Sequence, residues 1–222
     1  GLLFFAPASL SIWFIVRGID LFTSFLAAAA VLAAAQLDER SRGAFFSAVL
    51  FAIAFFSKQT AIFPMAGVAL FYLFNRRWRD AAIILAAFGA ITLSVSLVFE
   101  IMTGGWFFEN AFLMTSNNPF YYRLLVDLFR KFLLALPLMV PVALYQAVKK
   151  ARGSCGIWSF YFFSTFASMV LAAKVGAALS YFIPAFSAIC IMAGWWLSDL
   201  KLNASKPVRY AIVLLVLLQV LW

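Results

Sequence analysis

Nine apolar segments follow one another along the chain, separated by connections that hold most of the charged residues. The segments are Leu2–Val16, Leu21–Leu37, Ala44–Ser57, Ala61–Phe74, Ala81–Phe99, Phe132–Val148, Ile157–Ala173, Tyr181–Leu197 and Ala211–Trp222. Only 11% of the residues are charged, whereas about a quarter are charged in soluble domains, and the mean hydropathy is +1.03. Several segments approach the roughly 20 apolar residues of a membrane-spanning helix. The sequence therefore predicts an all-α, polytopic transmembrane helix bundle of about eight to nine membrane segments.

The chain has no initiator Met, and it begins and ends within apolar segments. No basic region precedes the first apolar run, so this run is not typical of a signal peptide. We therefore expect residues 1–222 to be part of a longer multi-pass membrane domain whose upstream segments are missing.

Basic residues alternate between rich and poor connections. The richer set holds Arg40, Arg42, Arg76, Arg77, Arg79, Lys149, Lys150, Arg152, Lys201, Lys206 and Arg209. The poorer set holds Arg17, Lys58, Arg123, Arg130, Lys131 and Lys174. The positive-inside rule assigns the richer set to the cytoplasm. This topology accounts for the net charge of +9, so no nucleic-acid partner is expected.

Lys58 lies in the polar turn "SKQT", residues 57–60, inside the apolar run 44–74. One helix over this run would be about 46 Å long, which exceeds a hydrocarbon core of about 30 Å. We therefore expect a hairpin with its crest slightly below the outer surface. Non-helical backbone at that depth is tolerated only where it lines protein or a watery cavity. Lys58 thus indicates a wet pocket that opens to the outside.

The longest connection, residues 100–131, is predicted to be an external loop. Its second half, "FYYRLLVDLFRKFLLAL", is typical of an amphipathic helix that lies at the membrane interface. Gly104-Gly105 and Asn117-Asn118-Pro119 are turn signals. An aromatic, half-buried flap over a pocket is the interpretation that this composition favours.

The outer connections hold the candidate functional residues. The chain contains no histidine, so carboxylates must supply any acid–base chemistry here. Two hairpin crests each present one lysine, Lys58 and Lys174, on the same side as Arg17 and Asp20. Such cations suit a phosphate or pyrophosphate head group. Alternatives remain open, because Arg17 and Asp20 also suit a local i,i+3 pair and the two lysines also suit snorkelling anchors.

Three stretches together resemble the GT-C superfamily of polytopic glycosyltransferases. They are "VRGIDLFTSFLAAAAVLAAA", "AVLFAIAFFSKQTAIFPMAGVALFYLFNRRWRD" and "KVGAALSYFIPAFSAICIMAGWW". The resemblance covers about residues 10–197 and is strongest to the bacterial branch of protein O-mannosyltransferases and the lipid A aminoarabinose transferase. It departs from the family pattern where Gly18-Ile19 replaces a proline and where Ser180 replaces an asparagine.

The resemblance implies transfer of a sugar from a polyprenyl-phosphate donor to a glycan, lipid or protein acceptor. The site would face the periplasm from the bacterial inner membrane. Asp20 would be an auxiliary catalytic residue and a candidate ligand for a divalent metal, with the main catalytic Asp upstream of Gly1. Arg17, Lys58 and Lys174 would bind the donor phosphate. The implied substrate-binding residues are Gln59, Glu109, Asn110, Arg123 and Tyr181.

Other classes also fit a polytopic chain with outward cations. A transporter or flippase of a lipid-linked sugar would need a polar pathway from the cytoplasm and usually internal repeats, neither of which is visible. An O-antigen polymerase or ligase would favour an arginine-rich soluble loop, whereas residues 100–131 are strongly apolar. A structural membrane subunit is the remaining alternative.

Overall fold

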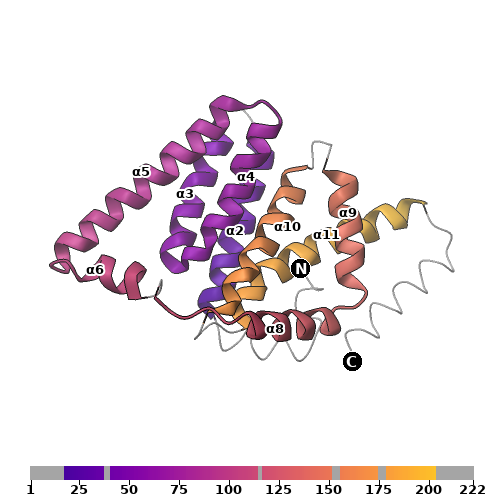
Figure 1. Ribbon diagram of the computed structural model, residues 1–222. Helices are drawn as coiled ribbons and strands as arrows, with labels where there is room; N and C mark the ends of the chain where they lie inside the picture. Colours follow the sequence, from indigo (N-terminus) through magenta and orange to yellow (C-terminus); the bar gives the residue numbers. More distant parts are fainter. Residues whose placement is uncertain (1–17, 38–40, 115–116, 152–155, 175–178, 204–222) are drawn as a thin grey trace.

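The computed structural model describes residues 18–37, 41–114, 117–151, 156–174 and 179–203 (Figure 1). The α-helices are α2 (Gly18–Gln36), α3 (Arg42–Ser57), α4 (Ile62–Phe74), α5 (Trp78–Met102), α6 (Trp106–Phe108), α8 (Tyr122–Ala135), α9 (Met139–Lys150), α10 (Gly156–Ser168) and α11 (Ile183–Asn203). Shorter helical turns are η3 (Gln59–Ala61), η4 (Glu109–Leu113), η5 (Met169–Ala173) and η6 (Leu179–Phe182). The described residues contain no strand beyond one isolated bridge. The prediction of an all-α membrane bundle is confirmed.

Helices α2 and α3 pack closely because the residues between them are small. The buried alanines of this pair are Ala27, Ala30, Ala34, Ala44, Ala48, Ala52 and Ala54. Small side chains let helix backbones approach in a membrane, where apolar lipid provides no hydrophobic drive for association. A Cβ on Gly43, in the first turn of α3, would lie 2.7 Å from the carbonyl oxygen of Leu37, so this close approach of α3 to the end of α2 requires glycine.

Helices α4 and α10 join the first half of the bundle to the second. A Cβ on Gly67 would lie 2.5 Å from Ser164 Oγ and 2.8 Å from the carbonyl oxygen of Phe160. The two helices therefore touch almost backbone to backbone at this glycine. Further along α10, the Tyr161 hydroxyl lies 2.9 Å from Ser187 Oγ on α11, which ties the second half together.

Within the described residues, the membrane spans are fewer than the sequence suggested for that part of the chain. Four described helices are long and apolar enough to cross a membrane: α2, α5, α10 with η5, and α11. A fifth span results if α8 and α9 count as one, but they are bent by 92°. The expected segment Phe132–Val148 breaks at Leu136, because Pro137 lacks an N–H and disfavours helical backbone before it.

Helices α3 and α4 are too short to span alone, with 16 and 13 residues or about 24 Å and about 20 Å. The predicted division of residues 44–74 at the SKQT turn is nonetheless confirmed, since α3 ends at Ser57 and α4 begins at Ile62. The expected segments Leu2–Val16 and Ala211–Trp222 lie outside the described residues.

Basic clusters gather at one end of the bundle, which we call the basic end. The turn between α4 and α5 and the C-terminal end of α9 lie there, at the top of Figure 1, while α6 and α8 lie at the opposite end. At the basic end Asp199 contacts Lys149 and Lys150, with N–O distances of 3.2 and 3.4 Å. Arg77 pairs with Asp80 in the first turn of α5 at 2.7 Å.

Candidate functional site

The turn between α3 and α4 presents Lys58 at the end opposite the basic clusters. Lys58 has extended backbone, with φ −159° and ψ 122°, which stops α3. Its N–H still donates to the carbonyl oxygen of Ala54 at 2.8 Å, and its own carbonyl accepts from Ala61 at 3.0 Å. The turn is therefore held from both sides, and it directs the lysine side chain away from the helix axes.

Lys58 forms an ion pair with Asp20, which lies in the first turn of α2. Asp20 is only 7% exposed, and the helix dipole makes the first turn of α2 a favourable place for an acidic residue. The Lys58 ammonium also lies 4.1 Å from the centre of the Tyr181 ring in η6. A carboxylate and an aromatic face together fix the position of this ammonium, because each attracts a cation.

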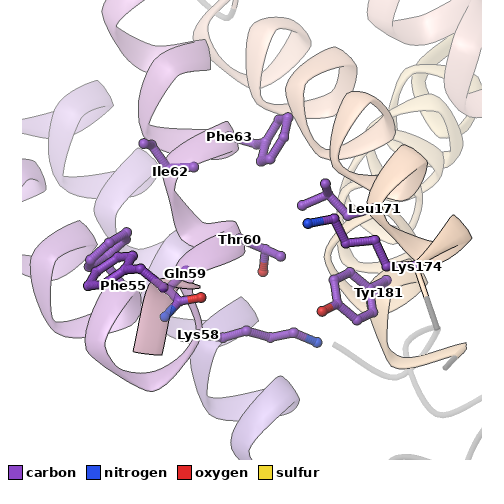
Figure 2. Close-up of a pocket in the computed structure, with 10 residues that line it drawn as sticks. Phe55, Lys58, Gln59, Thr60, Ile62, Phe63, Leu171, Lys174 and Tyr181 are labelled. Atoms are coloured by element: carbon purple, nitrogen blue, oxygen red, sulfur yellow. The ribbon is translucent and has the colours of Figure 1, made fainter. Parts of the chain in front are cut away.

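A cavity of about 360 Å³ opens beside this ion pair (Figure 2). That volume lies within the range of small-molecule and cofactor sites. Its polar side chains are Lys58, Gln59, Thr60, Lys174 and Tyr181, and its apolar ones are Phe55, Ile62, Phe63, Phe112 and Leu171. Figure 2 shows Lys58 and Lys174 reaching into the same space from opposite walls. A cavity that combines two ammonium groups with apolar walls suits an amphiphilic anion.

Lys174 belongs to the second wall, where η5 ends. Its extended backbone, with φ −75° and ψ 143°, forms an isolated antiparallel bridge with Phe120. Next to it, the Tyr121 N–H donates to the carbonyl oxygen of Ala173 at 2.8 Å. The start of α8 is thereby tied to the segment that carries Lys174, so the long connection and this wall are parts of one unit.

The first part of the long connection covers the cavity from the side of α3. Phe112 in η4 stacks on Phe55, with ring centres 6.3 Å apart, and Gln59 Nε2 donates to the carbonyl oxygen of Ala111 at 2.7 Å. Within the connection, Glu100 Oε2 accepts a hydrogen bond from the Phe108 N–H at 2.8 Å. The aromatic flap expected from the sequence therefore contributes one ring to the cavity wall.

The structure brings together some of the candidate residues from the sequence and separates others. Lys58, Gln59, Lys174 and Tyr181 line one cavity, and Asp20 reaches it through Lys58. The side chains of Glu109, Asn110 and Arg123 are exposed and are not among the residues that line the cavity. Asn110 Nδ2 instead donates to the carbonyl oxygen of Trp106 at 2.8 Å. Arg17 lies outside the described residues.

Six of the ten residues that line the cavity were not singled out from the sequence, and Thr60 and Phe112 are two of them. Thr60 belongs to the same SKQT turn as Lys58 and Gln59. Its place beside these two residues was the sequence signal that could have indicated its position in the cavity. Phe112 is one of 27 phenylalanines, so nothing in its local sequence distinguishes it from a residue that faces lipid.

Burial, followed by the negative charge of Asp20, raises the pKa of Tyr181 above its usual value of 10.0. The phenol therefore keeps its proton through the neutral range. A protonated Tyr181 can donate a hydrogen bond into the cavity, and its ring can attract the Lys58 ammonium at the same time.

A metal site at Asp20 does not fit the surroundings of this carboxylate. Among the described residues there is no group of three or more His, Cys, Asp or Glu side chains that could hold a metal ion. Asp20 is paired with the Lys58 ammonium, which competes with a cation for the same oxygen.

Comparison of the chain with protein-family models, with curated proteins and with solved structures found no match. The glycosyltransferase family expected from the motifs stays a prediction. Two ammonium groups, a paired carboxylate and one partly apolar cavity are the features on which a function can be argued.

Proposed function

We propose that the chain belongs to a membrane glycosyltransferase that uses a polyprenyl-phosphate sugar as donor. The acceptor would be a glycan, lipid or protein at the periplasmic face of a bacterial inner membrane. The single observation that supports this best is that Lys58 and Lys174, from separate turns, line one cavity whose other walls are largely apolar. The long apolar helices of the bundle place such a cavity in a membrane-embedded protein.

The chemistry needs a cation where the phosphate leaves. When the bond between the sugar and the phosphate breaks, negative charge builds up on the phosphate oxygens. Preorganised cations in a site of low dielectric stabilise that charge in the transition state. Lys58 is suited to this task because Asp20 and Tyr181 hold its ammonium before the donor arrives. Lys174 supplies a second positive charge from the opposite wall.

The apolar walls suit the lipid part of the donor and exclude water from the phosphate. Phe55, Phe63 and Leu171 contribute to these walls. Asp20 serves in this proposal as a positioning residue for Lys58, and Arg17 as a further phosphate contact. Asp20 is engaged by the lysine, so in this proposal a different carboxylate would deprotonate the acceptor hydroxyl.

The test is sugar transfer by the full-length protein, measured with a radiolabelled donor in proteoliposomes. Lys58→Gln should lower the turnover number at least 100-fold, the order found when one group that stabilises a developing anion is removed. Lys131→Gln is the matched control, because Lys131 pairs with Asp127 on the exposed surface of α8. This variant should transfer sugar at the wild-type rate. Unchanged turnover in Lys58→Gln would exclude Lys58 from the mechanism.

The same preparation separates a transferase from a transporter or flippase. A transferase forms a new glycosidic bond and releases polyprenyl phosphate. Movement of the labelled lipid between leaflets without such a product would overturn the proposal in favour of transport.

A further inference from the structure

Four buried side-chain atoms have no hydrogen-bond partner among the described residues: Ser47 Oγ, Thr60 Oγ1, Gln146 Oε1 and Ser159 Oγ. Only one of these four, the Thr60 hydroxyl, belongs to a residue that lines the cavity described above. Thr60 is 8% exposed, and Figure 2 shows it next to Lys58 and across from the wall that carries Lys174. A buried hydroxyl without a partner is costly, so its presence at a cavity requires a reason.

Local backbone bonding does not explain the Thr60 hydroxyl. Threonine and serine next to a helix N-terminus commonly cap it, yet neither η3 nor α4 has a side-chain cap. Several other hydroxyls of the bundle donate to a carbonyl of their own helix, as Thr23 does to Ile19 at 2.9 Å and Thr165 to Phe162 at 2.8 Å. Thr60, which lies in the short 3-10 turn η3, does neither.

We propose that Thr60 is a ligand-binding residue whose hydroxyl donates a hydrogen bond to the anionic head group held between Lys58 and Lys174. This inference rests on the proposed function, in which the cavity binds a phosphate-bearing lipid. An ammonium on a flexible stem attracts an anion from many directions. A hydroxyl on a short, buried side chain offers one direction, and its bond to a charged oxygen is stronger than a neutral one. Thr60 thus orients the head group that the lysines attract.

If Thr60 binds the ligand, replacing it should weaken binding without lowering the stability of the protein. Thr60→Val replaces the hydroxyl with a methyl group of similar size. Without ligand, the variant loses an unsatisfied buried oxygen, so its melting temperature should stay the same or rise. With ligand, the variant leaves a buried phosphate oxygen without its donor, so affinity should fall. A residue with a purely structural role would not weaken binding while leaving the fold equally stable.

The experiment measures binding of dodecyl phosphate to the full-length protein in maltoside micelles by isothermal titration calorimetry. Thr60→Val should raise the dissociation constant about 5- to 100-fold, as expected when a buried acceptor loses its partner. Thr60→Ser keeps the hydroxyl and should stay within about twofold of wild type. Ser47→Ala is the matched control, because it removes another unpartnered buried hydroxyl away from the cavity lining and should leave the dissociation constant unchanged.

Two further variants distinguish failure of this inference from failure of the proposed function. If Lys58→Gln and Lys174→Gln lose affinity while Thr60→Val binds as wild type does, the role of Thr60 is overturned and the phosphate site stands. If both lysine variants also bind as wild type does, dodecyl phosphate is not held in this cavity and both proposals fail. Thr60→Ala, measured in parallel, provides the same comparison should the valine variant fold poorly.

Discussion

The ion pair between Asp20 and Lys58 should couple α2 to the α3–α4 turn strongly. The side chains of Lys58 and Asp20 are only 17% and 8% exposed. Removing one partner of a buried pair leaves the other charge without compensation, which costs about 3–5 kcal/mol of the free energy of unfolding. When Asp20 is the residue removed, the contact of the Lys58 ammonium with the Tyr181 ring offsets about 1 kcal/mol of this loss. We therefore expect Asp20→Asn to lower the free energy of unfolding by about 2–4 kcal/mol, and Lys58→Met, which leaves the Asp20 carboxylate without that offset, to lower it by about 3–5 kcal/mol.

A double-mutant cycle measures this coupling directly. Reversible unfolding of the full-length protein in mixed micelles would be followed for wild type, Asp20→Asn, Lys58→Met and the double variant. The double variant should recover about 2 kcal/mol relative to the sum of the single changes. Asp127 and Lys131, an exposed i,i+4 pair at 2.8 Å, form the control cycle, with an expected coupling of about 0.3–0.5 kcal/mol. The reasoning would be refuted if the double variant lost as much free energy of unfolding as the two single variants together, within about 0.5 kcal/mol.

Three further outcomes follow from particular contacts. Gly67→Ala should lower the free energy of unfolding by about 1–3 kcal/mol because its Cβ meets α10, whereas Gly89→Ala, with nothing within 4 Å, should be neutral or slightly stabilising in the same assay. Glu100→Ala should speed hydrogen exchange of the Phe108 amide roughly tenfold, and an unchanged rate would contradict the bond between them. The pKa of Tyr181 is raised in the folded state. The contribution of Tyr181 to the free energy of unfolding is therefore fully present below pH 10.0 and is lost as pH rises through that higher pKa. Tyr181→Phe should therefore flatten the loss of stability above pH 10, and parallel curves would argue against it.

Much of the fold could be predicted from the sequence, because hydrophobic length and charge placement are local properties. The break at Lys58 followed from a run too long for one helix and from basic residues at both of its ends. For the described residues, the expected count of spans was too high because apolar composition does not reveal where a helix stops. Pro137 carries the bend between α8 and α9, and the short arms α3 and α4 differ from full spans only in length.

The candidate site was only partly visible in the sequence. Lys58 and Lys174 could be assigned to one side of the bundle because each lies in a turn on the poorly basic side. The partner of Asp20 could not be predicted, because pairing with Lys58 depends on how α2 packs against the α3–α4 turn. Thr60 and Phe112 reach the cavity through the same tertiary packing, for which spacing along the chain gives no rule.

The central claim is that Lys58 and Lys174 bind one phosphate group together, and lipid retention in native mass spectrometry tests it most directly. The full-length protein would be presented with equal amounts of a polyprenyl phosphate and the matching polyprenol, which differ only in the phosphate. Wild type should retain the phosphate form in clear excess, and Lys58→Gln and Lys174→Gln should each lose that preference. Equal retention of the two lipids by wild type, or an undiminished preference in either variant, would contradict the claim.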